Sequence, residues 1–227
     1  MKKVILLSGK SATGKDTSGL IIKRLLKNTN VELQSFASPM KEFLISSFNF
    51  PRENMYGPSS ARNEPTKYIW DNVAEKYRVA DGNLTYRDFL KLIGGAMREF
   101  MPDFWAFAAL EKARIFDGVS VLCDTRMKNE VDVFECSELE QITIRLLRKT
   151  QYSYSVHETE TNMDSWDFYP HQVDFSNCLV DLRQHKFITP TVLKMHKHPY
   201  HYMVDNNGSL KELESSIESI LVEEGIL

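Results

Sequence analysis

The sequence predicts a three-layer α/β/α fold, in which helices cover both faces of a parallel central sheet. Three observations support this prediction. Short apolar runs alternate with segments of helical periodicity, the first apolar run leads directly into a glycine-containing turn, and the chain has no internal repeat or low-complexity tract. Strands separated by helices are joined by crossover connections, so they lie parallel to one another.

The first half of the chain supplies two strand–helix pairs and an insertion. The elements expected in order are a strand at 4–7, a helix from about 15 to 27, a strand at 31–37 closed by Pro39, and a helix at 40–50. Residues 51–84 contain three prolines and two glycines, which indicates a loop-rich insertion with one short helix near 70–77. Such insertions often cover a ligand.

The second half resumes the alternation. Thr85 is placed to cap a helix that runs to about Phe100. The elements expected after it are a helix at 104–116, strands at 119–123, 142–147 and 202–204, and a C-terminal helix that begins at the capping box of Ser209 and Glu212. This order predicts one domain over residues 1–227.

Composition limits the classes of partner. The 227 residues carry 28 Lys and Arg against 31 Asp and Glu, a formal charge of -3, which argues against binding to nucleic acid or to an anionic membrane. The cysteines are Cys123, Cys136 and Cys178, an odd number without a CxxC pair, which favours a reducing cytoplasm over a disulfide framework. No segment approaches a membrane span. We therefore expect a small-molecule partner in the cytoplasm.

The strongest motif is the stretch GKSATGKDT, which follows the first strand and contains the pattern GxxxxGK. Glycines allow a tight turn whose backbone N–H groups point inward, the helix N-terminus adds partial positive charge, and the lysine reaches the outer phosphates of a nucleotide. We expect the whole stretch to bind nucleotide phosphates: Gly9, Lys10, Ser11, Ala12, Thr13, Gly14, Lys15, Asp16 and Thr17.

One position departs from the usual pattern. Asp16 stands where a Ser or Thr hydroxyl would meet Mg²⁺, and Thr17 follows one residue later. Two interpretations remain open: Asp16 contacts the metal directly or through water, or it only favours the first turn of the helix. Thr17 and Asp124 are the other candidate metal ligands.

Further polar groups follow the later strands, where an open α/β sheet binds its ligand. Asp124 comes directly after the strand at 119–123 and suits a magnesium–nucleotide site, although a solvated turn aspartate is the alternative. Positive charge for a transferred phosphoryl group could come from four arginines, each of which could also be an ordinary surface residue: Arg87, Arg98, Arg126 and Arg148. No general base is evident, and a phosphate monoester acceptor needs none.

With these motifs, the chain resembles the bacteriophage deoxynucleoside monophosphate kinases, relatives of the adenylate kinase-like P-loop kinases. The loop matches that family, including the Asp-Thr after the lysine, and so does CDTRMKNE, with Asp124, Arg126, Asn129 and Glu130. Other matches are SFASPMK at 35–41, the helix with Arg87 and Gly94, Trp105, Arg148, HETE at 157–160 and NGS at 207–209. Lys91 and Gly95 stand where the family usually has Gln and Thr, and residues 49–84 and 165–201 match poorly.

The resemblance implies transfer of the γ-phosphoryl group of ATP, with Mg²⁺, to a deoxynucleoside monophosphate. Lys15, Asp124, Arg126 and Arg148 would be the catalytic residues. The residues that would seat the acceptor are Ser38, Lys41, Arg87, Gly94, Gly95, Arg98, Trp105, Asp124, Arg126, Glu130, His157 and Glu160. Trp105 could equally be a core residue, and Glu130 a solvated carboxylate at a helix start.

The resemblance also divides the expected domain. Its core would be about 1–48, 85–150 and 200–227, with an acceptor-side insertion at 49–84 and a lid at 151–199 that carries His157 and closes over the phosphates. We interpret His196, His198 and His201 as part of a surface loop or hairpin, with a metal site as the weaker alternative. A homodimer is left open. The competing functions are a related kinase of phosphomevalonate or dephospho-coenzyme A type, and a nucleotide-binding regulator without transfer.

Overall fold

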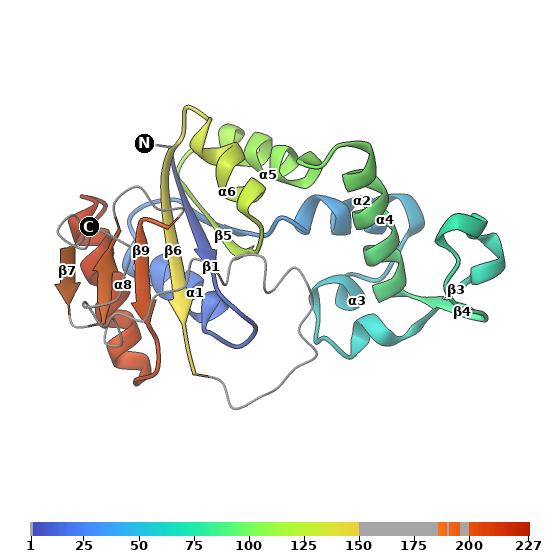
Figure 1. Cartoon of the computed structure of the whole chain (residues 1–227), viewed down its shortest axis with the longest axis horizontal. Coiled ribbons are helices and arrows are strands. Elements are labelled where there is room, and N and C mark those ends of the chain that lie inside the picture. Colours follow the sequence, from blue (N-terminus) through green and yellow to red (C-terminus); the bar gives the residue numbers. More distant parts are fainter. Residues whose placement is uncertain (1, 150–185, 190, 196–199) are drawn as a thin grey trace, which may run out of the picture. The chain divides into compact units, whose positions relative to one another are not determined.

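The computed structural model describes residues 2–149, 186–189, 191–195 and 200–227 (Figure 1). The chain divides into two compact units. The first consists of Met1–Phe36 and Leu110–Leu227, and the second of Ala37–Ala109. We describe each unit by itself.

Unit 1 is built on a seven-stranded sheet with the order β2-β5-β1-β6-β9-β8-β7. The first five strands of this order are parallel, and β8 and β7 extend the sheet in antiparallel pairing. The strands are β1 Lys3–Ser8, β2 Val31–Gln34, β5 Val119–Thr125, β6 Glu140–Leu147, β7 Lys186–Thr189, β8 Val192–Lys194 and β9 Tyr202–Asp205. The sequence thus predicted the parallel part, and the antiparallel edge is an addition to it.

In the described part of unit 1, the helices are α1 Lys15–Leu25, α6 Lys128–Glu135 and α8 Leu210–Glu223, together with the second half of α5 Phe104–Ile115. Ile5 and Leu7 of β1 pack in one buried cluster with Ile21 and Ile22 of α1 and with Ile217 of α8. All six residues of β1 are buried, so both faces of the sheet are covered there. The arrangement is α/β with a mostly parallel central sheet and is compatible with three layers.

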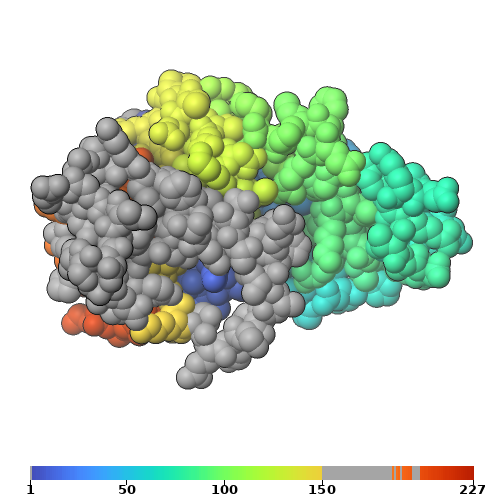
Figure 2. All heavy atoms as spheres, in the orientation of Figure 1, coloured from blue at the N-terminus to red at the C-terminus, as the bar shows by residue number. Residues whose placement is uncertain are grey.

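Unit 2 contains α2 Ser38–Phe48, α3 Arg52–Tyr56, α4 Tyr86–Phe100, the start of α5, and a hairpin of β3 Pro65–Ile69 with β4 Asn83–Thr85. Three short 3₁₀ turns complete it: η1 Ala61–Asn63, η2 Trp70–Asn72 and η3 Glu75–Tyr77. Its own core gathers Met40, Leu44, Phe50, Met55 and Trp105. Figure 2 shows residues of about 60–100 as one continuous surface from teal to green.

Two sequence expectations need correction here. The helix expected near 70–77 is two 3₁₀ turns, because Val73 and Ala74 between them have extended backbone with ψ of 136° and 140°. The strand expected at 31–37 ends at Gln34, and Pro39 does not close it but lies in the first turn of α2, where proline lacks no needed N–H. The β3–β4 hairpin was not predicted.

The length and apolar composition that a membrane crossing requires do not occur together in any helix of the described residues.

Candidate functional site

The strand order places side by side two strands whose following connections run to opposite sides of the sheet. Strands β1 and β6 are adjacent, yet the chain leaves β1 towards β2 on one side of the sheet and leaves β6 towards β7, β8 and β9 on the other. In open α/β sheets, ligands bind outside the carboxyl ends of the strands at such a switch point. The loop 9–14 starts directly at the carboxyl end of β1, so it occupies this position.

The backbone of the loop needs its two glycines. Gly9 has φ of +146° and Gly14 has φ of +97°, and both lie where L side chains are strained. A Cβ at Gly9 would come within 2.7 Å of the carbonyl oxygen of Leu146, and one at Gly14 within 2.6 Å of Nδ2 of Asn206. At both positions, glycine therefore allows the chain to turn and neighbouring atoms to approach closely.

Hydrogen bonds hold the loop in one conformation. Thr13 Oγ1 donates to the carbonyl oxygen of Lys10 at 2.8 Å, and Asn206 Nδ2 donates to that of Thr13 at 2.8 Å. The Lys15 ammonium lies across the loop and donates to the carbonyl oxygens of Gly9 and Lys10, each at 2.6 Å. Among the described residues, no side chain caps the N-terminus of α1. The first-turn N–H groups of a helix without a side-chain cap, beside an ammonium, form an anion-binding arrangement.

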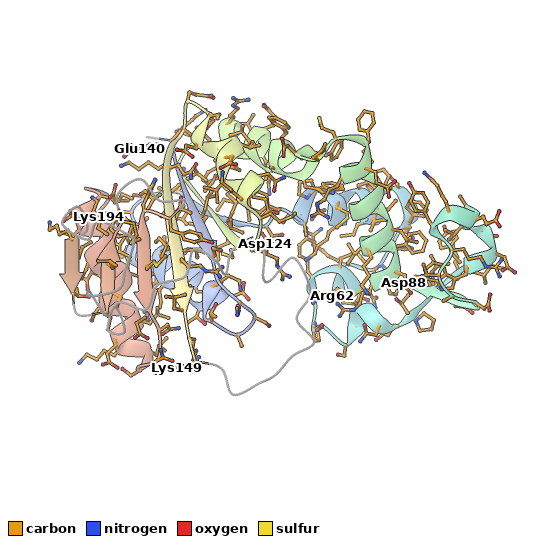
Figure 3. The ribbon with its side chains drawn as sticks, in the orientation of Figure 1. Arg62, Asp88, Asp124, Glu140, Lys149 and Lys194 are labelled. Atoms are coloured by element: carbon orange, nitrogen blue, oxygen red, sulfur yellow. The ribbon has the colours of Figure 1, made fainter. Side chains whose placement is uncertain are left out.

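Acidic groups converge beside the loop. Burial, together with the negative charges of Asp16 and Asp124, raises the pKa of the Cys123 thiol to about 12, and the positive charge of Lys15 opposes this rise. These three charged side chains therefore lie around Cys123, which remains a protonated thiol at neutral pH. Asp124 lies near the end of β5, where its Oδ1 accepts from the backbone N–H of Phe36 at 2.8 Å (Figure 3).

The donor set beside the loop suits a hard cation. Carboxylate oxygens of Asp16 and Asp124 and the hydroxyl of Thr17 are the ligand types that Mg²⁺ prefers. Among the described residues, no group of three or more His, Cys, Asp or Glu side chains is arranged so that it could hold a metal ion. A magnesium ion here would therefore complete its shell with water and with oxygens of a bound phosphate, as is usual for Mg²⁺ at nucleotides.

Glu130 has a clear structural contact. Its Oε2 accepts from the backbone N–H groups of Arg126 at 2.7 Å and Met127 at 3.1 Å, and the residue is 5% exposed. The carboxylate thus caps α6 and is buried. The alternative that Glu130 is a solvated carboxylate at a helix start is wrong in this respect. Capping fixes the turn that presents Arg126, whose side chain is exposed.

A buried arginine in β6 was missed from sequence. Arg145 is 2% exposed, donates from Nη1 to Ser8 Oγ at 2.9 Å, and lies 5.5 Å from the centroid of the Tyr200 ring. The signal was present, since Arg145 interrupts an apolar strand. Arg148, which was predicted, is exposed just beyond β6. His157 and Glu160, and all but a few residues of the expected lid, lie outside the described residues.

In unit 2, the predicted acceptor residues of α4 and α5 form a packed contact. Trp105 is 7% exposed, and its Nε1 donates to the carbonyl oxygen of Gly94 at 3.2 Å. Arg98 Nη1 donates to the same oxygen at 3.3 Å. A Cβ at Gly94 would lie 3.4 Å from Met40 Sδ, whereas Gly95 faces open space. Trp105 therefore has a packing role, which was one of its two interpretations.

The predicted residues of α2 meet an aromatic ring. Lys41 Nζ lies 4.6 Å from the centroid of the Tyr56 ring, and Arg52 lies over the same ring at 4.9 Å. The Tyr56 hydroxyl donates to Glu42 at 2.7 Å. Burial and the Glu42 carboxylate raise the pKa of Tyr56 to about 12. Ser38 is buried at the start of α2.

Unit 2 also contains an apolar cavity of about 300 Å³. At 100° per residue, the residues of α4 that line it lie on the side of the helix opposite Arg87 and Arg98. The cavity is therefore separate from the predicted acceptor residues of this helix. Its lining is Phe48, Tyr68, Ile69, Asn72, Val73, Tyr77, Leu84, Phe89, Leu92, Ile93 and Ala96.

No protein-family model matches the chain, and no curated protein shows a significant sequence match.

Proposed function

We propose that the protein is an ATP-dependent kinase that phosphorylates deoxynucleoside 5'-monophosphates to the diphosphates. The observation that carries the proposal is the loop 9–14 at the switch point, with glycines in a backbone conformation that would strain other residues and with Lys15 across it. Backbone N–H groups at the start of α1 and the Lys15 ammonium supply positive potential where the triphosphate of ATP would lie. The sequence resemblance to the deoxynucleoside monophosphate kinases extends the proposal from ATP binding to transfer of the phosphoryl group.

In the proposed reaction, the protein positions two nucleotides and neutralises the phosphoryl group in transit. Lys15 and Arg126 would stabilise charge on the transferred group, with Arg148 assisting. Asp124 and Asp16, with Thr17, would hold Mg²⁺, which when bound neutralises charge on the donor phosphates. The acceptor would be seated by residues of unit 2 that include Ser38, Lys41, Arg87 and Arg98. A host cytoplasm is the proposed location, with a bacteriophage as the proposed source.

Two other functions remain in competition. A related kinase could take phosphomevalonate or dephospho-coenzyme A, because the loop recognises only the donor. A nucleotide-binding regulator that transfers no phosphoryl group would need the loop, but it would not need the arginines of unit 2. The arginines of α4 favour a kinase over a regulator.

The test is ADP formation from ATP and Mg²⁺ with dGMP, dTMP, dCMP, dAMP and their ribose counterparts, followed by chromatography of the products. The proposal predicts deoxynucleoside diphosphates equal in amount to the ADP released. ATP binding without transfer to any monophosphate would contradict it. Transfer to phosphomevalonate or dephospho-coenzyme A instead would select the related kinases.

A further inference from the structure

The start of the loop 9–14 is held by a buried arginine of the neighbouring strand. Ser8 is the last residue of β1, is fully buried and is followed directly by Gly9. Arg145 lies opposite Ser8 in the parallel register of β6 with β1, and its Nη1 donates to Ser8 Oγ at 2.9 Å. The side chain from which the loop departs is therefore fixed by a charge-assisted hydrogen bond.

Arg145 lies on the face of the sheet opposite α1 and α8. Its neighbours Ile144 and Leu146 belong to the core cluster that packs against those helices, and side chains alternate between the two faces along a strand. Arginine is seldom buried, and its guanidinium stays protonated in proteins. A positive charge thus lies within the protein at the strand that borders the loop.

The guanidinium is fixed on a second side. It lies 5.5 Å from the centroid of the ring of Tyr200, which is fully buried just before β9. An arginine over an aromatic ring gains a favourable cation–π contact, which is larger where water is excluded. With Ser8 and Tyr200 both buried, the Nη1 donor has a defined position.

Strand β6 also supports the first residue of the loop. A Cβ at Gly9 would come within 2.7 Å of the carbonyl oxygen of Leu146, so the backbone of Gly9 packs directly on β6. The other end of the loop is held by the hydrogen bond from Asn206 to the carbonyl oxygen of Thr13. The loop is therefore fixed at both ends by buried side chains of neighbouring strands and their ends.

This fixation matters for a loop that binds an anion through its backbone. N–H groups held in place before the ligand arrives bind it more tightly, because no ordering of the loop has to occur on binding. A buried positive charge beside the loop also favours a polyanion, since charges interact more strongly where the dielectric constant is low. Both effects act on the donor phosphates.

We infer that Arg145 is a positioning residue of the phosphate-binding loop, which it holds through Ser8 in the conformation that takes the triphosphate of ATP. That the ligand is ATP rests on the proposed function. Arg145 is not among the residues that carry the sequence resemblance. The contacts of its guanidinium with Ser8 and Tyr200 are what selects it.

The experiment measures the dissociation constant of ATP with Mg²⁺ by titration calorimetry in the wild type, Arg145→Met, Ser8→Ala and the double variant. Arg145→Met should raise the constant about tenfold or more, because it removes a hydrogen bond from a charged group. Ser8→Ala should raise it too, and the double variant should bind no more weakly than Arg145→Met, since the two residues act as one unit. Arg24→Met, which removes an exposed arginine paired with Glu214, should bind as the wild type does.

A purely structural arginine would lower the free energy of unfolding and leave ATP affinity unchanged, so unchanged affinity in folded Arg145→Met would overturn the inference. Multiplied effects in the double variant would show that Arg145 does not act through Ser8. If Arg145→Met fails to fold, Ser8→Ala decides, because it leaves the arginine in place.

Steady-state kinetics separate this role from that of the acceptor residues. Where the wild type transfers phosphate, Arg145→Met should raise the ATP KM by a similar factor and leave the acceptor KM unchanged. A wild type that binds ATP without transfer would contradict the proposed function alone, because the dissociation constants still decide the role of Arg145. A wild type that does not bind ATP would overturn both.

Discussion

Asn206 fastens the loop 9–14 to the sheet. Its backbone N–H donates to the carbonyl oxygen of Leu147 at 2.8 Å, and its side chain donates to that of Thr13 at 2.8 Å. The residue is 6% exposed, so water does not readily replace these bonds. A single amide thus joins the loop after the first strand to the end of the last parallel strand.

Asn206→Ala should weaken ATP binding by freeing the loop. Removing the amide leaves the Thr13 oxygen without this donor, which costs about 1–3 kcal/mol. We expect the ATP KM to rise several-fold with a smaller change in kcat, measured by steady-state kinetics. Ser219→Ala, which removes an exposed hydroxyl of α8, is the control. An unchanged ATP KM in Asn206→Ala would show that the loop needs no such anchor.

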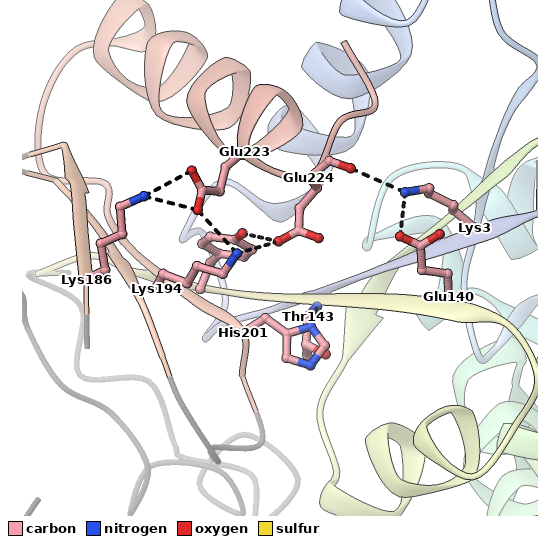
Figure 4. A network of polar contacts seen from close by, with 9 residues as sticks. Lys3, Glu140, Thr143, Lys186, Lys194, His201, Glu223 and Glu224 are labelled. Carbon is pink, nitrogen blue, oxygen red and sulfur yellow. Dashed lines mark hydrogen bonds and ion pairs between the residues drawn. The ribbon is translucent and has the colours of Figure 1, made fainter. Parts of the chain in front are cut away.

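His201 lies in a polar region near the end of α8 (Figure 4). Its Nδ1 accepts from the backbone N–H of Thr143 at 3.3 Å, which requires that this nitrogen be unprotonated. Burial lowers the pKa of His201 below its ordinary 6.5, against the opposing charges of Glu224 and Glu135, while the positive charge of Lys194 lowers it further. The folded protein therefore holds the neutral imidazole.

This predicts loss of stability in mild acid. A lowered pKa means that the unfolded chain binds the proton more readily, so the stabilisation is complete above pH 6.5 and falls as the pH drops towards the folded-state pKa. Urea unfolding at a series of pH values should show a steeper fall below pH 6.5 in the wild type than in His201→Gln. Equal slopes in the two proteins would rule out this role for His201.

At the scale of elements, the start of α1 depends on backbone that only glycine adopts without strain. Gly14 combines φ of +97° with a neighbour 2.6 Å from where a Cβ would be, whereas Gly225 has φ of +61° and no neighbour within 4 Å. Both glycines have a positive φ, and they differ in how much space a Cβ would have. A comparison of alanine variants at the two positions therefore isolates the effect that the close neighbour of Gly14 has on stability.

Gly14→Ala should therefore destabilise the protein more than Gly225→Ala. Left-handed backbone costs an alanine about 1–2 kcal/mol at either position. At Gly14 the methyl group also displaces Asn206, so the free energy of unfolding should fall further and ATP affinity should drop, as measured by urea unfolding and by titration calorimetry. Equal losses in both variants would mean that the loop accommodates the methyl group.

Elements with local signals were predictable from sequence, and elements set by distant contacts were not. The cap at Thr85 and the capping box of Ser209 with Glu212 are confirmed as the starts of α4 and α8. The strands β7 and β8 have no alternating pattern of their own and form only as an extension of β9. The contacts of Arg145 with Ser8 and Tyr200 join residues that are far apart in the sequence, so sequence spacing did not reveal them.

At the scale of the whole molecule, the chain builds two cores. Ile5, Ile21 and Ile217 belong to the core of unit 1, and Leu44 and Trp105 to that of unit 2. Apolar periodicity reports which face of an element is buried and not against what that face packs, so the sequence did not show that the chain has two separate cores. Unit 2 accordingly extends beyond the insertion expected at 49–84 and includes α2, α4 and part of α5.

In the proposed function, the loop 9–14 of unit 1 serves phosphoryl transfer from ATP. The most direct measurement follows the γ-phosphoryl group from labelled ATP to a deoxynucleoside monophosphate in the wild type, in Lys15→Ala and in Lys23→Ala, an exposed lysine in the last turn of α1. We expect labelled diphosphate from the wild type and from Lys23→Ala, and a rate at least about a hundredfold lower from folded Lys15→Ala. Wild-type rates in Lys15→Ala, or no labelled diphosphate from the wild type, would contradict it.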